Sequence, residues 1–125
     1  MREDSNRQIA VEQDLLPKSD LAIDREAILI MKKIQVIVSG KVQGVGFRKY
    51  TQNKAEQLGV VGFVQNLSDG TVKIVAAGED DRVDALINWA KSGSPPAKVD
   101  NLEIETMEYQ SGEFDRFEIR RFYPQ

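Results

Sequence analysis

One stretch of the chain combines a run of glycines with a single arginine. Gly40, Gly44 and Gly46 precede Arg48 within nine residues. Glycines let a backbone turn its N–H groups toward an anion, and the N-terminus of a following helix adds positive potential. The planar guanidinium of Arg48 can hold two oxygens of a tetrahedral anion at once. The stretch therefore predicts a phosphate-binding loop, although such glycines also occur in turns with a purely geometric role.

This stretch matches neither of two common nucleotide-binding motifs. A P-loop ends in Lys followed by Ser or Thr, and the dinucleotide motif G-x-G-x-x-G would need glycine where Lys49 stands. No hydroxyl or acidic side chain is placed to hold a magnesium ion. We therefore expect a phosphoryl group to bind without a nucleotide, a metal ion or another cofactor.

The composition of the chain limits its chemistry and its location. It contains no cysteine and no histidine, which excludes disulfides, thiolate catalysis and phosphohistidine intermediates. The lack of cysteine fits a reducing compartment, and we expect the cytoplasm. No stretch approaches the roughly 20 apolar residues of a transmembrane helix, and the N-terminus lacks the basic start of a signal peptide. We expect no membrane association.

The charges are distributed unevenly along the 125 residues, which suffice for one compact domain. Residues 1–30 carry four basic and seven acidic side chains, whereas residues 31–125 carry thirteen of each. We interpret residues 1–30 as a flexible N-terminal extension, with a weak helix over Leu21–Ile30 as the alternative, and residues 31–125 as the functional domain. A neutral domain gives little support for nucleic-acid binding, and we expect a monomer.

Hydrophobic periodicity predicts the elements that position the glycine loop. A β-branched alternating run from Ile34 to Val38 precedes the loop, and helical spacing from Phe47 to Leu58 follows it, with Gly59 as a stop. Further predicted elements are a hairpin of residues 60–67 and 71–77 turning at Asp69-Gly70, a helix around residues 83–90 stopped by Gly93, and strands over 99–108 and 114–122. This β-α-β-β-α-β order with an added C-terminal strand predicts an α+β, ferredoxin-like sandwich, with two helices on one face of a mostly antiparallel sheet.

The same residues carry a resemblance to the acylphosphatase family. Ser39 through Arg48, Tyr50-Thr51, Gly62 through Asn66 and Asp69-Gly70 resemble the family's motifs. The resemblance covers roughly residues 33–120 and omits residues 1–30; Phe63 stands where the family often has tryptophan. It implies hydrolysis of the carboxyl-phosphate bond of acyl phosphates to a carboxylate and inorganic phosphate, which are then the expected small-molecule partners.

The resemblance also implies roles for single residues. Arg48 matches the family's phosphate-binding arginine, and Asn66 matches the asparagine that positions the attacking water. Thr51 is expected to support the site, either by a hydrogen bond near Asn66 or by packing in the core. The backbone amides expected to bind phosphate beside Arg48 are those of Gln43, Gly44, Val45, Gly46 and Phe47.

An acyl phosphate suits a site that lacks a general acid. Its leaving group is a carboxylate whose conjugate acid has a pKa of about 4, so the leaving group needs no proton. Arg48 and the loop amides would neutralise charge on the phosphoryl oxygens. The amide of Asn66 does not accept a proton at neutral pH, so its role would be to orient water by hydrogen bonding.

Other functions stay open on the sequence alone. Ferredoxin-like folds also build RNA-binding and metabolite-sensing modules, but residues 34–39 and 71–77 lack the aromatic side chains that RNA binding favours. Another alternative is a domain that handles carbamoyl phosphate within a larger carbamoyl-transfer protein. Taken singly, Arg48 could be a surface salt-bridge partner and Asn66 a turn-forming residue.

Overall fold

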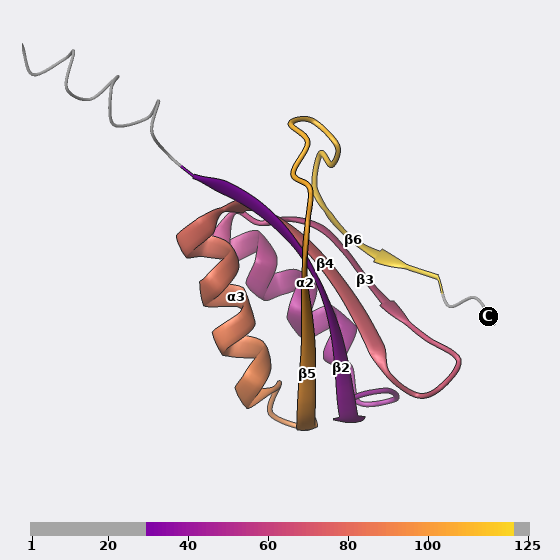
Figure 1. Ribbon diagram of the computed structural model, residues 1–125. Coiled ribbons are helices and arrows are strands. Elements are labelled where there is room, and N and C mark those ends of the chain that lie inside the picture. The colour runs from indigo at the N-terminus through magenta and orange to yellow at the C-terminus, as the bar shows by residue number, and fades with distance from the viewer. Residues whose placement is uncertain (1–29, 122–125) are drawn as a thin grey trace, which may run out of the picture. The chain divides into compact units, whose positions relative to one another are not determined.

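A computed structural model describes residues 30–121 of the chain. The expected flexible extension, residues 1–30, lies outside the described residues except for Ile30. The elements are, in order, β2 (Met31–Lys41), α2 (Phe47–Leu58), β3 (Val61–Asn66), β4 (Val72–Glu79), α3 (Asp80–Ser92), β5 (Lys98–Met107) and β6 (Phe117–Arg120). Helices α2 and α3 pack together on one face of the sheet, which confirms the predicted α+β, ferredoxin-like arrangement (Figure 1).

The described strands form a sheet in the order β5-β2-β4-β3-β6. Strand β2 is antiparallel to both of its neighbours, β5 and β4, and β4 is antiparallel to β3. Strand β6 is parallel to β3, so the sheet is mixed at this edge and mostly antiparallel elsewhere, as predicted. Strands β5 and β6 lie at opposite edges of the sheet, so residues 108–116 cross from one edge to the other at one end of the sheet (Figure 1). Strand β6 therefore begins at the same end of the sheet as β3.

The last strand is shorter than predicted. The sequence predicts a strand over residues 114–122, whereas β6 spans Phe117–Arg120. Phe114 instead lies in the connecting loop, and its ring packs against that of Phe63, with ring centroids 6.2 Å apart. Phe114 is therefore apolar because it packs against Phe63, not because it belongs to a strand. For this reason the hydrophobic pattern predicted a start of the strand that is three residues too early.

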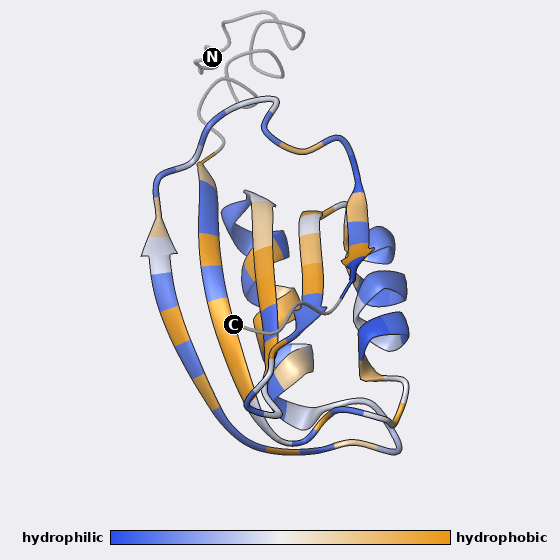
Figure 2. Ribbon diagram, turned by 90° about the vertical axis from the view of Figure 1, so that its right-hand side faces the viewer, coloured by the Kyte–Doolittle hydropathy of each residue, from blue (hydrophilic) through white to orange (hydrophobic). Residues whose placement is uncertain are grey.

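The core lies between the sheet and the two helices. Alternate residues of the strands face the helices, and hydrophobic and hydrophilic residues accordingly alternate along the strands (Figure 2). Both helices end at the predicted glycines, Gly59 and Gly93. The buried residues of this core include Ile34, Val36, Val38, Phe47, Ala55, Val64, Val72, Ile74, Val83, Leu86 and Phe117.

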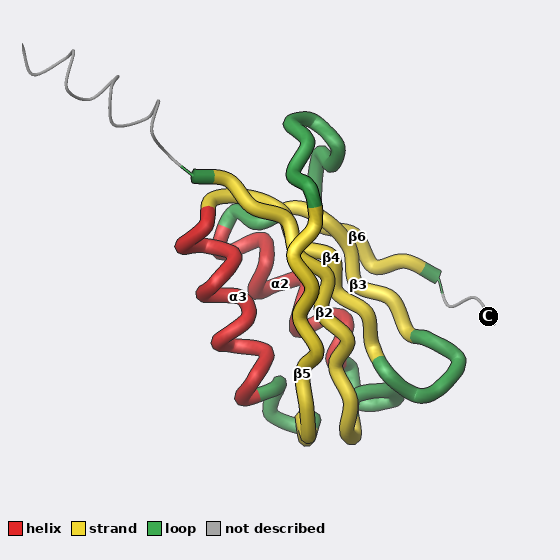
Figure 3. Tube along the Cα trace, viewed as in Figure 1, coloured by secondary structure: helices red, strands yellow, loops and turns green. Residues whose placement is uncertain are grey.

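Two loops emerge at the same end of the sheet. Strands β2 and β3 are both antiparallel to β4, so they run in the same direction. Residues 42–46 follow β2 and lead into α2, while residues 67–71 follow β3 and turn back into β4, as the predicted hairpin requires. Both segments lie at one end of the sheet (Figure 3). The glycine loop is thereby brought next to Asn66, the last residue of β3.

In the described part of the chain, no helix combines the length and apolar character that crossing a membrane requires.

The buried leucine of α3 provides a test of the core. Leu86 is 1% exposed, so Leu86→Ala removes apolar contacts and leaves a cavity. We expect the free energy of unfolding to fall by about 2–5 kcal/mol, measured by urea denaturation followed by circular dichroism. The exposed Lys91 of the same helix is the control, and Lys91→Ala should change stability by no more than about 0.5 kcal/mol. Equal stability of Leu86→Ala and the parent would contradict the assignment of this core.

Candidate active site

A pocket of about 180 Å³ opens at the end of the sheet where the two loops meet. This volume suits a phosphoryl group and a water rather than a drug-sized ligand, whose pockets usually measure about 300–1,000 Å³. Arg48 and Asn66, the two predicted catalytic residues, therefore share one pocket. The residues that line it are Val42, Gly44, Gly46, Phe47, Arg48, Lys49, Asn66 and Ile119.

The loop owes its path to two glycines. Gly44 has a φ of 74° and Gly46 a φ of 76°, in the left-handed region that residues with a side chain rarely adopt. A Cβ atom at Gly44 would meet nothing within 4 Å, so the backbone conformation rather than the available space requires glycine there. Turns of this kind bring successive N–H groups toward one point, where an anion can bind.

The N–H groups of the loop lack partners. Among residues 30–121, no backbone carbonyl accepts a hydrogen bond from the N–H groups of residues 43–48. Helix α2 begins after Gly46 without a capping side chain, and its first turn contains no acidic residue. An uncapped N-terminus leaves unsatisfied donors and a partial positive charge. The beginning of α2 and the loop before it therefore favour a bound anion.

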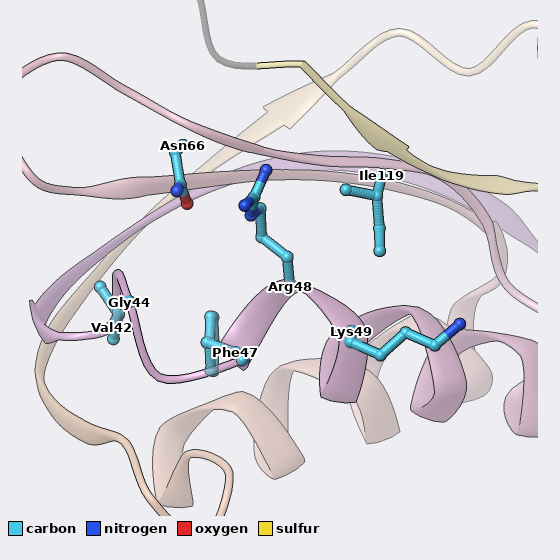
Figure 4. A pocket seen from close by; sticks show the side chains of 8 residues that line it. Val42, Gly44, Phe47, Arg48, Lys49, Asn66 and Ile119 are labelled. Carbon is cyan, nitrogen blue, oxygen red and sulfur yellow. The ribbon is translucent and has the colours of Figure 1, made fainter.

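The side chain of Arg48 reaches from the first turn of α2 toward the sheet, and its guanidinium group lies beside the side chain of Asn66 (Figure 4). In the part of the chain that the structure describes, the ion pairs do not include Arg48, so the salt-bridge alternative has no support there. A cation at the positive end of a helix is unfavourable unless an anion offsets it. Lys49, in contrast, points away from Asn66, and its Nζ donates to Oε1 of Gln52 at 3.1 Å (Figure 4).

Asn66 contributes an unsatisfied acceptor to the pocket. Its Oδ1 is buried and has no hydrogen-bond partner among the described residues. Buried polar side-chain atoms nearly always have a partner, and an exception requires an explanation such as a bound water or ligand. The side chain points into the space that the Arg48 guanidinium also borders (Figure 4). This oxygen therefore keeps an unused capacity to accept a hydrogen bond.

Three of the predicted site residues do not line the pocket. Gln43 directs its side chain to the hairpin turn, where Nε2 donates to the carbonyl oxygens of Leu67 and Thr71, each at 2.8 Å. Val45 packs against the core. Thr51 is fully buried and its Oγ1 donates to the carbonyl oxygen of Phe47 at 2.8 Å, so of the two arrangements considered for Thr51 the structure shows core packing.

Three further residues line the pocket although no role was predicted for them: Val42, Lys49 and Ile119. Ile119 reaches it because β6 pairs in parallel with β3, with Ile119 opposite Val64. No local signal in the sequence predicts that pairing. Ile119 is 38% exposed whereas Val42 is 1% exposed, so Ile119 offers accessible apolar surface at the pocket.

The pocket offers no side chain of the types that usually hold metal ions. Its lining residues include no Asp, Glu, His or Cys. Within residues 30–121, the carboxylates close enough to share an ion are those of Asp80, Asp81 and Asp84, at the start of α3. Nζ of Lys32 pairs with Asp80 at 2.6 Å and with Asp84 at 2.7 Å, so a lysine already compensates this acidic cluster.

The α+β fold and a pocket that joins an arginine to unsatisfied amides define a phosphoryl-binding protein. The family model described as Acylphosphatase matches residues 34–119. An acylphosphatase from Acaryochloris marina is 49% identical over 88 residues, covering 70% of this chain and 92% of that protein. The structure of an acylphosphatase from Coxiella burnetii matches with a TM-score of 0.68 and 42% identity, covering 72% of this chain and 93% of that one. The chain therefore belongs to the acylphosphatase family.

Membership of this family confirms the resemblance, and with it the activity. The chain is a hydrolase that acts on acid anhydrides and cleaves the carboxyl-phosphate bond of small-molecule acyl phosphates. A similar fold also occurs within a much larger protein. Full-length HypF, solved in a phosphate- and nucleotide-bound form, matches with a TM-score of 0.69 and 28% identity, covering 78% of this chain but 13% of that one.

The turn next to Asn66 contains a carboxyl group that should titrate at low pH. The hydroxyl group of Thr71 donates a hydrogen bond to Oδ1 of Asp69, with an oxygen–oxygen distance of 2.6 Å, and the backbone N–H of Thr71 donates to the same oxygen at 3.0 Å. These bonds, the hydroxyl bond first, lower the pKa of Asp69 below its ordinary value of 3.8. Because the pKa is lower in the folded state, the carboxylate stabilises the fold above the unfolded-state pKa, and this stabilisation is lost as the pH falls through the folded-state pKa.

We expect Thr71→Val to raise the pKa of Asp69 toward its ordinary value, because the substitution removes the hydroxyl donor. The measurement is an NMR titration of the Asp69 carboxyl group in both proteins. Thr106→Val, on β5, is the control and should leave this pKa unchanged. An unchanged pKa of Asp69 in Thr71→Val would show that the hydroxyl bond is not its cause.

Proposed function

We propose that this chain hydrolyses acyl phosphates by in-line attack of water on phosphorus, without a metal ion, with Arg48 binding the phosphoryl group and Asn66 orienting the water. One observation carries the proposal. Arg48 and Asn66 line the same small pocket, and Oδ1 of Asn66 is buried without a hydrogen-bond partner among the described residues. The guanidinium group of Arg48 suits phosphoryl oxygens, and Oδ1 of Asn66 suits a hydrogen of a water molecule.

In the bound state, Arg48 forms two parallel N–H···O bonds to the phosphoryl group. The amides of residues 43–47 add donors from the opposite side, supported by the positive end of α2. The donors are fixed by the loop before substrate arrives, so they need little reorganisation as charge develops on the phosphoryl oxygens. The charge of the substrate thus replaces the missing cap of α2.

In the chemical step, Oδ1 of Asn66 accepts a hydrogen bond from a water and holds its oxygen in line with the bond to be broken. A bond forms between the water oxygen and phosphorus, and the bond between phosphorus and the acyl oxygen breaks. The electron pair of the broken bond stays on the carboxylate, which needs no proton because its conjugate acid has a pKa of about 4. The proton of the water passes to a phosphoryl oxygen, since the amide of Asn66 does not accept it.

The acyl group stays largely outside the pocket. A volume of about 180 Å³ suits the phosphoryl end and a water. Ile119 provides exposed apolar surface at the edge of the pocket. We infer that the enzyme accepts a broad range of acyl phosphates, with apolar acyl groups resting against Ile119.

We further infer a monomeric enzyme in the cytoplasm without a nucleic-acid partner. The domain of residues 31–125 is neutral overall, and the sequence has no cysteine, which fits a reducing compartment. The aromatic Phe63 is 8% exposed, and the guanidinium group of Arg120 lies 3.8 Å from the centre of its ring. This ring is therefore covered rather than open to stacking with a base.

A second candidate is the handling of carbamoyl phosphate as part of a larger assembly. The observation in its favour is the structural match to a small part of HypF. The pocket would bind the phosphoryl end of a substrate, and this end is the same in benzoyl phosphate and carbamoyl phosphate. Comparing kcat/KM for these two substrates distinguishes the candidates, because a general acylphosphatase should hydrolyse benzoyl phosphate at least as well.

Substitutions at the two proposed catalytic residues should have different effects. Arg48→Gln removes the charge-assisted bonds to phosphate, so we expect kcat/KM to fall by at least about a thousandfold and inhibition by inorganic phosphate to weaken strongly. Asn66→Ala removes only the water ligand, so kcat should fall by about 100- to 1,000-fold while the inhibition constant for phosphate changes by less than about twofold. Steady-state hydrolysis of benzoyl phosphate measures both effects.

Lys54→Gln is the control for these variants, because it removes a positive charge from the same helix outside the pocket. It should keep the parental kcat and KM. Hydrolysis by Asn66→Ala at the parental rate would show that the water-positioning role is wrong. Undiminished phosphate inhibition of Arg48→Gln would show that Arg48 is not the phosphate ligand.

The metal-free mechanism predicts full activity in the presence of a chelator. The pocket supplies no carboxylate, imidazole or thiolate, and the carboxylate leaving group does not require a Lewis acid. We expect kcat/KM for benzoyl phosphate to stay the same after dialysis against EDTA, and to stay the same when Mg²⁺ or Zn²⁺ is then added. Loss of activity in EDTA with recovery on adding one of these ions would refute this part of the proposal.

A further inference from the structure

The side chain of Gln43 connects the phosphate loop to the hairpin turn that follows Asn66. Its Nε2 is 2.8 Å from the carbonyl oxygen of Leu67 and 2.8 Å from that of Thr71. Leu67 and Thr71 also close the turn, because the N–H of Leu67 donates to the carbonyl oxygen of Thr71 at 2.9 Å. A single side-chain amide thus uses both of its N–H groups to fasten the loop to the turn.

This contact joins two segments that are separated by the width of one strand. The loop follows β2 and Asn66 ends β3, and β4 lies between these two strands. At about 4.8 Å between neighbouring strands, the ends of β2 and β3 are about 10 Å apart. Ladder pairing of β3 with β4 ends at Asn66 and Val72, so the backbone beyond Asn66 depends on the turn and on Gln43 for its position.

We propose that Gln43 is a positioning residue, whose side chain sets the distance between the phosphoryl group held by the loop and the water held by Asn66. The proposal rests on the proposed function of Asn66. In-line attack requires the reacting atoms to be about 3–3.5 Å apart, and a misplacement of about 1 Å can lower the rate by about a hundredfold. The loop amides and Asn66 belong to different segments, so a direct bond between these segments governs that distance.

The chemistry of the side chain fits this role. Glutamine supplies two N–H donors from one nitrogen, as two adjacent carbonyl acceptors require. Methionine has a similar length and no donor, and an ionised glutamate would place a negative charge against both carbonyl oxygens. Either substitution should release the turn from the loop without altering the backbone amides that face the phosphate.

The first measurement compares Gln43→Met and Gln43→Glu with the full-length parent. We expect kcat for benzoyl phosphate to fall by about 10- to 100-fold in both variants, while the inhibition constant for inorganic phosphate changes by less than about twofold. The matched control is Gln52→Met on α2, which also removes a bond from a glutamine amide to a carbonyl, that of Phe117 at 3.1 Å. This control should keep the parental kcat, and thermal unfolding of all variants separates stability effects from rate effects.

The second measurement repeats Gln43→Met in the Asn66→Ala background. If Gln43 acts through Asn66, the additional substitution should change kcat by less than about twofold, because the residue to be positioned is already absent. A full additional loss of kcat, or phosphate inhibition that weakens in parallel with kcat, would overturn the proposal and assign Gln43 to the loop alone.

The variants also separate this proposal from the one on which it rests. Parental activity of Asn66→Ala would refute the role of Asn66, and the positioning role of Gln43 with it. A large loss of kcat in Asn66→Ala together with parental kcat in both Gln43 variants would refute the positioning role alone.

Discussion

The interaction on which the site depends is the one between an anion and the beginning of α2. An arginine in the first turn of a helix opposes the helix dipole, and here no capping side chain or acidic residue offsets it. In the proposed site a phosphoryl group would resolve both problems, because it would pair with Arg48 and accept bonds from the amides of the loop. The left-handed glycines at positions 44 and 46 follow from the same requirement, since they turn these amides toward the pocket.

The sheet supplies the second half of the site. Because β2 and β3 run in the same direction on either side of β4, the anion-binding loop and Asn66 meet at one end of the sheet. The bonds from Gln43 to the turn after Asn66 join these two halves. The proposed mechanism requires little more of the protein, because in it the carboxylate leaves without a proton and the phosphoryl group accepts the proton of the water. Binding and orientation therefore account for a site that contains neither a histidine nor a carboxylate.

The sequence predicted those features that have local signals. Both helix ends coincide with glycines, and the hairpin follows from Asp69-Gly70 between two apolar runs. Features that depend on distant contacts were missed: the parallel pairing of β6, the contact of Phe114 with Phe63, and the side-chain bonds of Gln43. For the site, residue spacing indicated an anion loop ending in Arg48, whereas the role of Asn66 came from the resemblance to acylphosphatases, because an asparagine before a turn has no distinctive local signal.

The most direct test of this account is an NMR titration of the protein with inorganic phosphate, following its backbone amides and the side chains of Arg48 and Asn66. The account predicts saturable shifts concentrated in the amides of residues 43–48 and in the Arg48 Nε–H signal, with smaller shifts at the Asn66 side chain. Amides at the opposite end of the sheet, such as that of Lys32 at the start of β2, should stay unchanged. Binding that shifts other regions and leaves residues 43–48 unaffected would contradict the central claim that this loop and Arg48 form the phosphoryl site.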